Sequence, residues 1–106
     1  MKFLCVCQDG NVRSVAMAYQ LHNKHGHEAV PVGWKRLSKA SLDLFCEWAD
    51  RIVIMQAEYA DKIGDAFKSK ILIAEVGRDR YGCKWGRGLP ELVAGITAQW
   101  KADGTI

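Results

Sequence analysis

The sequence predicts an α/β fold: a three-layer sandwich in which a parallel sheet of four strands carries helices on both faces. Short apolar runs alternate with longer segments whose apolar residues recur at helical spacing, in the order β-α-β-α-β-α-β-α. Within the runs, successive positions are apolar, as in strands buried on both faces of a parallel sheet. With 106 residues, 49% of them hydrophobic, the chain suits a single domain over 1–106.

The first strand and helix form one β-loop-α unit. Residues 2–6 include the continuous apolar run Phe3-Leu4-Cys5-Val6 and predict a central strand. Apolar side chains at helical spacing then predict a helix from Arg13 to about His25, which Gly26 ends.

The second strand is predicted over 28–33. Pro31 within it has no N–H for the strand ladder, which places this strand at an edge of the sheet. The helix after it is predicted from apolar positions over 42–49, with Ser38 or Ser41 as its N-cap.

The second half of the chain repeats this alternation. Residues 51–55, Arg51-Ile52-Val53-Ile54-Met55, predict the third strand, and the spacing over 57–67 predicts a helix. Residues 71–74 predict the fourth strand. An apolar stripe over 89–100 predicts the last helix, with Pro90 in its first turn.

One segment carries most of the functional information: Cys7-Gln8-Asp9-Gly10-Asn11-Val12-Arg13-Ser14, directly after the first strand. In parallel sheets, ligands bind at the carboxyl ends of the strands, where Cys7 lies. Five residues between a cysteine and an arginine can surround an anion with backbone N–H groups, while the guanidinium holds two of its oxygens. The same groups favour the thiolate of Cys7, which makes it a candidate nucleophile. A chance Cys…Arg pair with Cys7 as a buried strand residue is the alternative.

This segment resembles the active-site loop of the low-molecular-weight protein tyrosine phosphatases, whose pattern is Cys, five residues, Arg, Ser between the first strand and the first helix. The resemblance implies strand order 2-1-3-4, which makes the second strand an edge, as Pro31 requires. It implies that Cys7 attacks phosphorus, that Arg13 and the loop amides bind the phosphate, and that Ser14 hydrogen-bonds near the thiolate. No metal or other cofactor is expected.

The chain departs from the family pattern and resembles a short, divergent member. Asp9 and Gly10 stand where the family has Gly and Asn, and Asn11 is displaced by one position. Glycine can adopt the left-handed backbone expected at the third position after the cysteine. Asp9 weakens anion binding unless it points outward. Val12 stands in place of the family's second loop cysteine.

The segment 75–88 is the candidate acid loop, with four glycines. The resemblance implies an Asp-Pro-Tyr-like motif here, and Asp79-Arg80-Tyr81 is the nearest match. Asp79 is the candidate general acid; the alternative is an exposed aspartate paired with a neighbouring arginine. Tyr81 and Trp85 are candidate walls of the substrate cleft, or side chains that hold the loop to the core.

The predicted function is a phosphomonoesterase, a protein tyrosine phosphatase that forms a phosphocysteine intermediate. Its expected ligands are a phosphotyrosine protein or aryl phosphate and inorganic phosphate. The alternatives are a catalytically weak oxyanion-binding protein and a phosphocysteine carrier.

Other functions have less support. Basic residues interleaved with Trp85 suit single-stranded nucleic acid, but that function leaves Cys7 and Arg13 unexplained. The three histidines lack the companions of a metal site, and Cys5 or Cys83 are the candidates for a redox role. With no long apolar run and no signal peptide apparent, we expect a cytoplasmic protein without membrane contacts.

Overall fold

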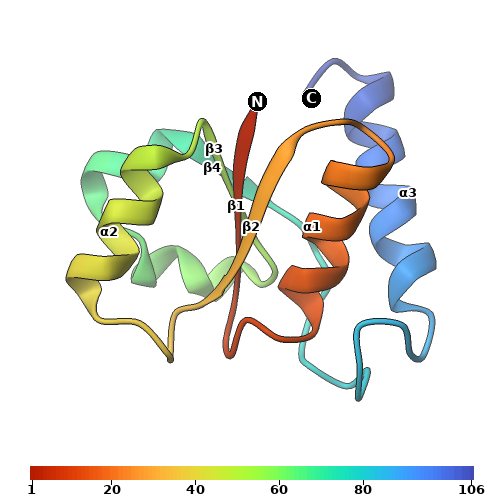
Figure 1. The fold of residues 1–106 in the computed structure, drawn as a ribbon, viewed down its shortest axis with the longest axis horizontal. Coiled ribbons are helices and arrows are strands. Elements are labelled where there is room, and N and C mark those ends of the chain that lie inside the picture. The colour runs from red at the N-terminus through yellow and green to blue at the C-terminus, as the bar shows by residue number, and fades with distance from the viewer.

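The computed structural model describes residues 1–106 and contains a four-stranded, fully parallel sheet in the order β2-β1-β3-β4 (Figure 1). Both the α/β class and the strand order agree with the predictions. The elements in chain order are β1 (Lys2–Cys7), α1 (Arg13–Asn23), β2 (Glu28–Gly33), α2 (Lys39–Trp48), β3 (Arg51–Ile54), the 3₁₀ helices η1 (Ala57–Lys62) and η2 (Asp65–Lys70), β4 (Ile71–Ile73) and α3 (Leu89–Ala102).

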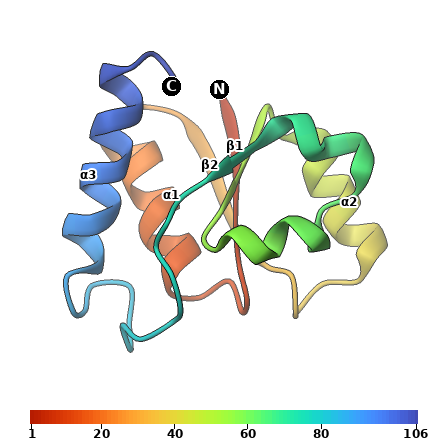
Figure 2. The ribbon, with the colours of Figure 1, turned by 180° about the vertical axis from the view of Figure 1, so that it is seen from behind.

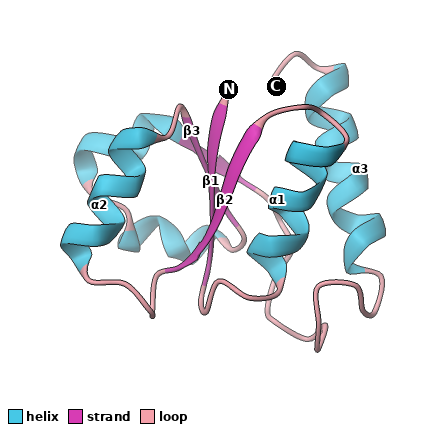
Figure 3. Cartoon of the chain, in the orientation of Figure 1, coloured by secondary structure: helices cyan, strands magenta, loops and turns pink.

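Helices cover both faces of the sheet. α1 and α3 pack against each other on one face, and α2, η1 and η2 lie on the other (Figures 1 and 2). The secondary-structure colouring shows the sheet between these two groups (Figure 3). No helix combines the length and apolar composition that a bilayer crossing requires.

The centre of the sheet is β1, which pairs with β2 on one side and β3 on the other. Its residues from Phe3 to Val6 are completely buried, as expected of a strand covered on both faces. Pro31 lies opposite Cys5 in the edge strand β2, where its missing N–H has no third strand to bond.

Two side chains cap the helix α2. The Ser38 hydroxyl oxygen accepts the backbone N–H of Ser41 at 3.1 Å, so Ser38 is the N-cap. At the other end, Lys70 Nζ donates to the carbonyl oxygens of Cys46, Glu47 and Ala49 at 2.9, 3.3 and 2.7 Å. A cation at this position complements the partial negative charge of a helix C-terminus.

The predicted helix over 57–67 is wrong. The segment forms two short 3₁₀ helices separated by extended residues, Ile63 (ψ 131°) and Gly64 (ψ 147°). The break lets the Ile63 side chain enter the core, where it is 2% exposed. Burial at this one position outweighs a continuous helix, which Gly64 disfavours in any case.

Candidate active site

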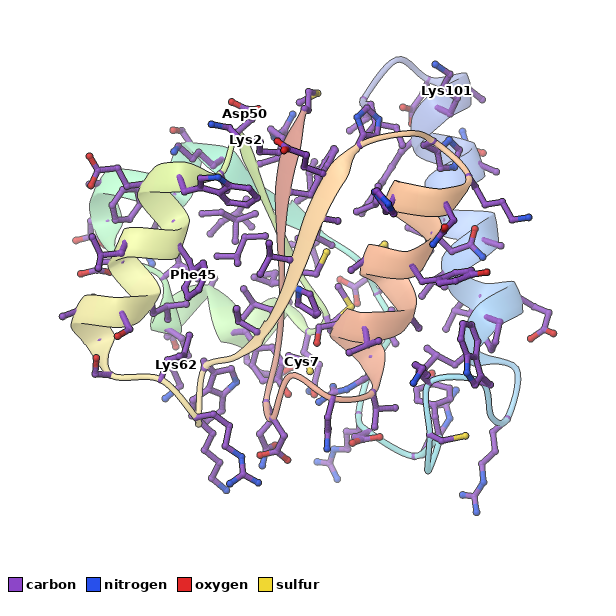
Figure 4. All side chains as sticks on the ribbon, viewed as in Figure 1. Lys2, Cys7, Phe45, Asp50, Lys62 and Lys101 are labelled. Carbon is purple, nitrogen blue, oxygen red and sulfur yellow. The ribbon has the colours of Figure 1, made fainter.

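Cys7 ends β1 at the carboxyl edge of the sheet, where Figure 4 labels it. Its thiol is buried and donates to Ser14 Oγ at 3.1 Å, while the Gly10 N–H donates to Cys7 Sγ at 3.1 Å. When the sulfur is a thiolate, the Ser14 hydroxyl can turn and donate instead. Both contacts therefore suit a negatively charged sulfur.

The loop after Cys7 is rich in free hydrogen-bond donors. From Gln8 to Val15, the Gly10 amide is the only backbone N–H with a protein acceptor. α1 begins after Val12, whose apolar side chain makes no cap hydrogen bond. The uncapped helix end and the loop amides together offer the donors that a phosphate group needs.

A close backbone contact fixes the shape of this loop. Gly10 has φ +77°, the left-handed backbone expected at the third position after the cysteine. A Cβ on Gly10 would lie 2.5 Å from the nitrogen of Gly33, and one on Gly33 would lie 2.2 Å from the carbonyl carbon of Asp9. Gly33, at the end of β2, is a site residue that the sequence analysis missed.

Asp9 does not leave an uncompensated negative charge beside the loop. Its Oδ1 lies 3.3 Å from Nε of Arg36, an exposed residue in the connection after β2. The pair is partly exposed and its energy is small, on the order of 0–1 kcal/mol. The arrangement nevertheless gives the carboxylate a cationic partner other than Arg13.

Arg13 is 1% exposed, and three oxygens hold its guanidinium. Nη1 donates to Gln56 Oε1 at 2.5 Å and to the Gly77 carbonyl oxygen at 2.6 Å; Nη2 donates to the Tyr59 hydroxyl at 3.0 Å. Nε is buried and has no hydrogen-bond partner. A buried, unpaired donor on a charged group is costly, and an oxyanion would satisfy it.

Gln56 and Tyr59 are further site residues that the sequence analysis missed. Gln56 follows β3 after Met55, and Tyr59 lies in η1. Because β3 is the neighbour of β1, its carboxyl end adjoins the Cys7 loop. The sequence held one signal for Gln56: it is a polar residue just after a buried strand, and that strand lies next to the central one.

A cavity of about 470 Å³ lies beside this loop and includes Asp79. Its lining combines three carboxylates, one arginine, two amides and one tyrosine: Gln8, Asp9, Gln56, Glu58, Tyr59, Arg78 and Asp79. Asp79 is exposed and has no ion pair. The structure thus brings the candidate acid to the same cavity as the first two residues after Cys7.

Neither candidate aromatic wall lines that cavity. Tyr81 is 2% exposed, and its hydroxyl donates to the Val76 carbonyl oxygen at 2.9 Å, so it fixes the acid loop to the core. Trp85 is half exposed and packs edge to face on Tyr19 of α1, with ring centroids 4.9 Å apart. Neither ring is among the residues that line the cavity, and their contacts suit the alternative role of holding the loop to the rest of the protein.

The remaining sulfur and imidazole groups form no second site. All four cysteines are free thiols, and burial raises the pKa of Cys5 far above its ordinary value, with the neighbouring Cys7 adding to the effect. Cys83 is exposed. No three His, Cys, Asp or Glu side chains gather in a metal-binding group.

Three solved structures that superpose on this chain are phosphatases. The tyrosine phosphatase AmsI of Erwinia amylovora superposes with a TM-score of 0.71 at 13% identity, over 96% of this chain and 91% of AmsI. The YwlE arginine phosphatase of Geobacillus stearothermophilus gives 0.60 at 17% identity, over 96% and 94%. A cysteine-to-serine mutant of YwlE with a phosphorylated active-site serine gives 0.65 at 17% identity, over 97% of both chains.

No protein-family model matches the chain, and no curated protein matches its sequence. The structural likeness extends over almost the whole chain and includes the strand order that the Cys7–Ser14 motif implied. The chain therefore has the fold of the low-molecular-weight tyrosine and arginine phosphatases.

Proposed function

We propose that the protein is a phosphatase that works through a phosphocysteine intermediate on Cys7. One observation carries the proposal: Cys7 begins a loop whose backbone amides, apart from that of Gly10, have no protein acceptor, and the loop leads to the buried Arg13, whose Nε has no partner. Such a loop can hold the three non-bridging oxygens of a phosphoryl group so that the leaving group lies in line with the attacking sulfur. The phosphatase structures of the same fold support it.

In the first step, Cys7 Sγ attacks phosphorus while the bond from phosphorus to the leaving group breaks. Asp79, protonated, gives its proton to the departing atom. In the second step, Asp79 takes a proton from the attacking water, the P–S bond breaks, and inorganic phosphate forms. The Ser14 hydroxyl, next to Sγ, stabilises the thiolate that leaves.

The chemistry of the cavity supports a second candidate substrate besides an aryl phosphate. Besides the proposed acid Asp79, its lining has two carboxylates (Asp9 and Glu58) against one exposed arginine, Arg78, and Tyr59 is its only aromatic residue. A phosphorylated guanidinium, as in phosphoarginine, keeps a positive charge next to its phosphate and complements these carboxylates. The YwlE arginine phosphatases share the fold.

Turnover is tested with p-nitrophenyl phosphate and with phosphoarginine, both in the presence of a metal chelator. Cys7→Ser should abolish release of phosphate from both while phosphate still binds. Cys83→Ser, the same change at an exposed cysteine, is the matched control and should keep activity. Normal turnover by Cys7→Ser would exclude the mechanism.

Two further results would select the alternatives. Tight phosphate binding by the wild type without hydrolysis at any pH would indicate an oxyanion-binding protein. A stable phosphocysteine formed only from a phosphoprotein donor would indicate a carrier.

The preference between the two substrates is tested with Glu58→Gln. This variant should lower kcat/KM for phosphoarginine and leave kcat/KM for p-nitrophenyl phosphate unaffected if the carboxylates recognise the cation.

A further inference from the structure

The guanidinium of Arg13 has a defined set of hydrogen bonds. An arginine has five N–H donors: one on Nε and two on each Nη. Nη1 uses both of its donors, on Gln56 Oε1 and on the Gly77 carbonyl oxygen. Nη2 uses one, on the Tyr59 hydroxyl. The Nε–H and one N–H of Nη2 remain.

The two side-chain acceptors act together. Tyr59 Oη donates to Gln56 Oε1 at 2.6 Å, so the two oxygens are almost as close as those of one carboxylate. Each accepts from a different terminal nitrogen of Arg13, which is how a carboxylate binds the end of a guanidinium. This end-on contact leaves the free Nε–H and Nη2–H side by side on the other edge.

We propose that Gln56 and Tyr59 are positioning residues that hold the end of the Arg13 guanidinium and so present its Nε edge to the bound oxyanion. The inference rests on the proposed function, because it concerns the same phosphate site. The edge that they leave free has the two parallel donors that bind two oxygens of a phosphate at once.

The side chain of Tyr59, which accepts a hydrogen bond from Arg13, is itself fixed by its neighbours. Tyr59 is 5% exposed, and its ring meets the Trp34 ring edge to face at 5.7 Å between centroids. The backbone N–H of Trp34 in turn donates to the Cys7 carbonyl oxygen at 3.0 Å. The Tyr59 hydroxyl therefore has a fixed position and restricts the orientation of the Arg13 guanidinium.

The test removes one oxygen and leaves the ring. Tyr59→Phe should weaken phosphate binding about tenfold, the effect of losing one hydrogen bond to a charged group. The control is Thr97→Val, which removes a buried hydroxyl in α3 that bonds the carbonyl oxygens of Val93 and Ala94. It should lower the melting temperature comparably and leave phosphate affinity unchanged.

A second readout reports the orientation of Arg13 without turnover. Cys7 should react faster with iodoacetate, which is anionic, than with neutral iodoacetamide, because the free guanidinium edge attracts the carboxylate. Tyr59→Phe should lower this rate ratio, whereas a general loss of stability changes both rates together. Gln56→Leu, at a half-buried position on the cavity, should lower it as well without disturbing the core.

The outcomes separate the two proposals. Wild-type phosphate affinity and rate ratio in both Tyr59→Phe and Gln56→Leu would overturn the positioning role and leave the phosphatase proposal standing. Equal weakening by Thr97→Val would overturn it too, since the effect would then follow stability alone. A wild type that neither binds phosphate nor prefers iodoacetate would overturn both proposals.

Discussion

Replacing Gly33, which lies outside the Cys7 motif, by alanine should disable the proposed phosphate site. Gly33 ends β2, on the strand next to Cys7, and its Cα faces the backbone of the loop. A Cβ there would lie 2.2 Å from the carbonyl carbon of Asp9 and 2.5 Å from its oxygen. Both contacts are with backbone, so no side chain can rotate to relieve them.

The size of the effect follows from these distances. Ordinary contact of a Cβ begins near 3.4 Å, so β2 and the loop must separate by about 1.2 Å at this point. Overpacking of this kind costs about 1–3 kcal/mol of folding free energy. A displacement of ~1 Å at reacting groups lowers a rate by roughly a hundredfold, and kcat/KM should fall by about that factor.

The assay is phosphate affinity and hydrolysis of p-nitrophenyl phosphate, with the melting temperature measured alongside. Gly95→Ala is the matched control, because a Cβ at that helical position meets nothing within 4 Å. It should keep activity and stabilise α3 by up to about 1 kcal/mol. Wild-type phosphate affinity in Gly33→Ala would refute the coupling between β2 and the loop.

Three further predictions concern single side chains. Asp79→Asn should lower kcat about a hundredfold. It should also remove the limb of the pH–rate profile that falls toward alkaline pH, because a general acid acts only while protonated. An unchanged profile would exclude Asp79 as the acid. Lys70→Met removes the cation from three carbonyl oxygens at the end of α2 and should lower the free energy of unfolding, measured in urea, by about 1–2 kcal/mol. A loss no larger than that caused by Lys24→Met, at an exposed position, would contradict the capping role of Lys70. Burial, with a smaller contribution from Asp43, raises the pKa of Cys46 from 9.0 to about 11, so the unfolded thiol ionises first and the free energy of unfolding should fall as pH rises from 9 to 11. Cys46→Ala should make this fall less steep, while the buried Cys5 keeps its own contribution, and an equal slope in both proteins would show that Cys46 does not contribute.

Local patterns in the sequence predicted the strands well, and they correctly placed the Cys7–Ser14 segment between the first strand and the first helix. The run before Cys7 is buried as a central strand must be, and Pro31 lies in the edge strand. These features depend on residues close together in the chain. Periodicity and the missing N–H of proline report them directly.

Where distant contacts decide, the prediction for 57–67 was wrong, and the sequence left two roles open for Tyr81. Spacing over 57–67 fits one helix, but burial of Ile63 divides the segment. Tyr81 is a loop aromatic by sequence, and only the folded chain shows that it is buried with its hydroxyl bonded to Val76. Neither outcome can be read from propensity, because both depend on which core surface each residue meets.

The proposed anion site depends on the topology of the sheet as much as on the Cys7–Ser14 motif. The three acceptors that hold Arg13 are 43, 46 and 64 residues away in sequence: Gln56, Tyr59 and Gly77. They meet because β3 lies beside β1 and β4 beside β3, which brings the ends of these strands to one edge. Gly77 is also two residues before Asp79, so the arginine that is proposed to bind phosphate contacts the loop that carries the proposed acid. A shift of the guanidinium would therefore move the backbone next to Asp79. Phosphate binding and proton donation should accordingly change together when Gln56 or Tyr59 is altered, but separately when Asp79 alone is changed.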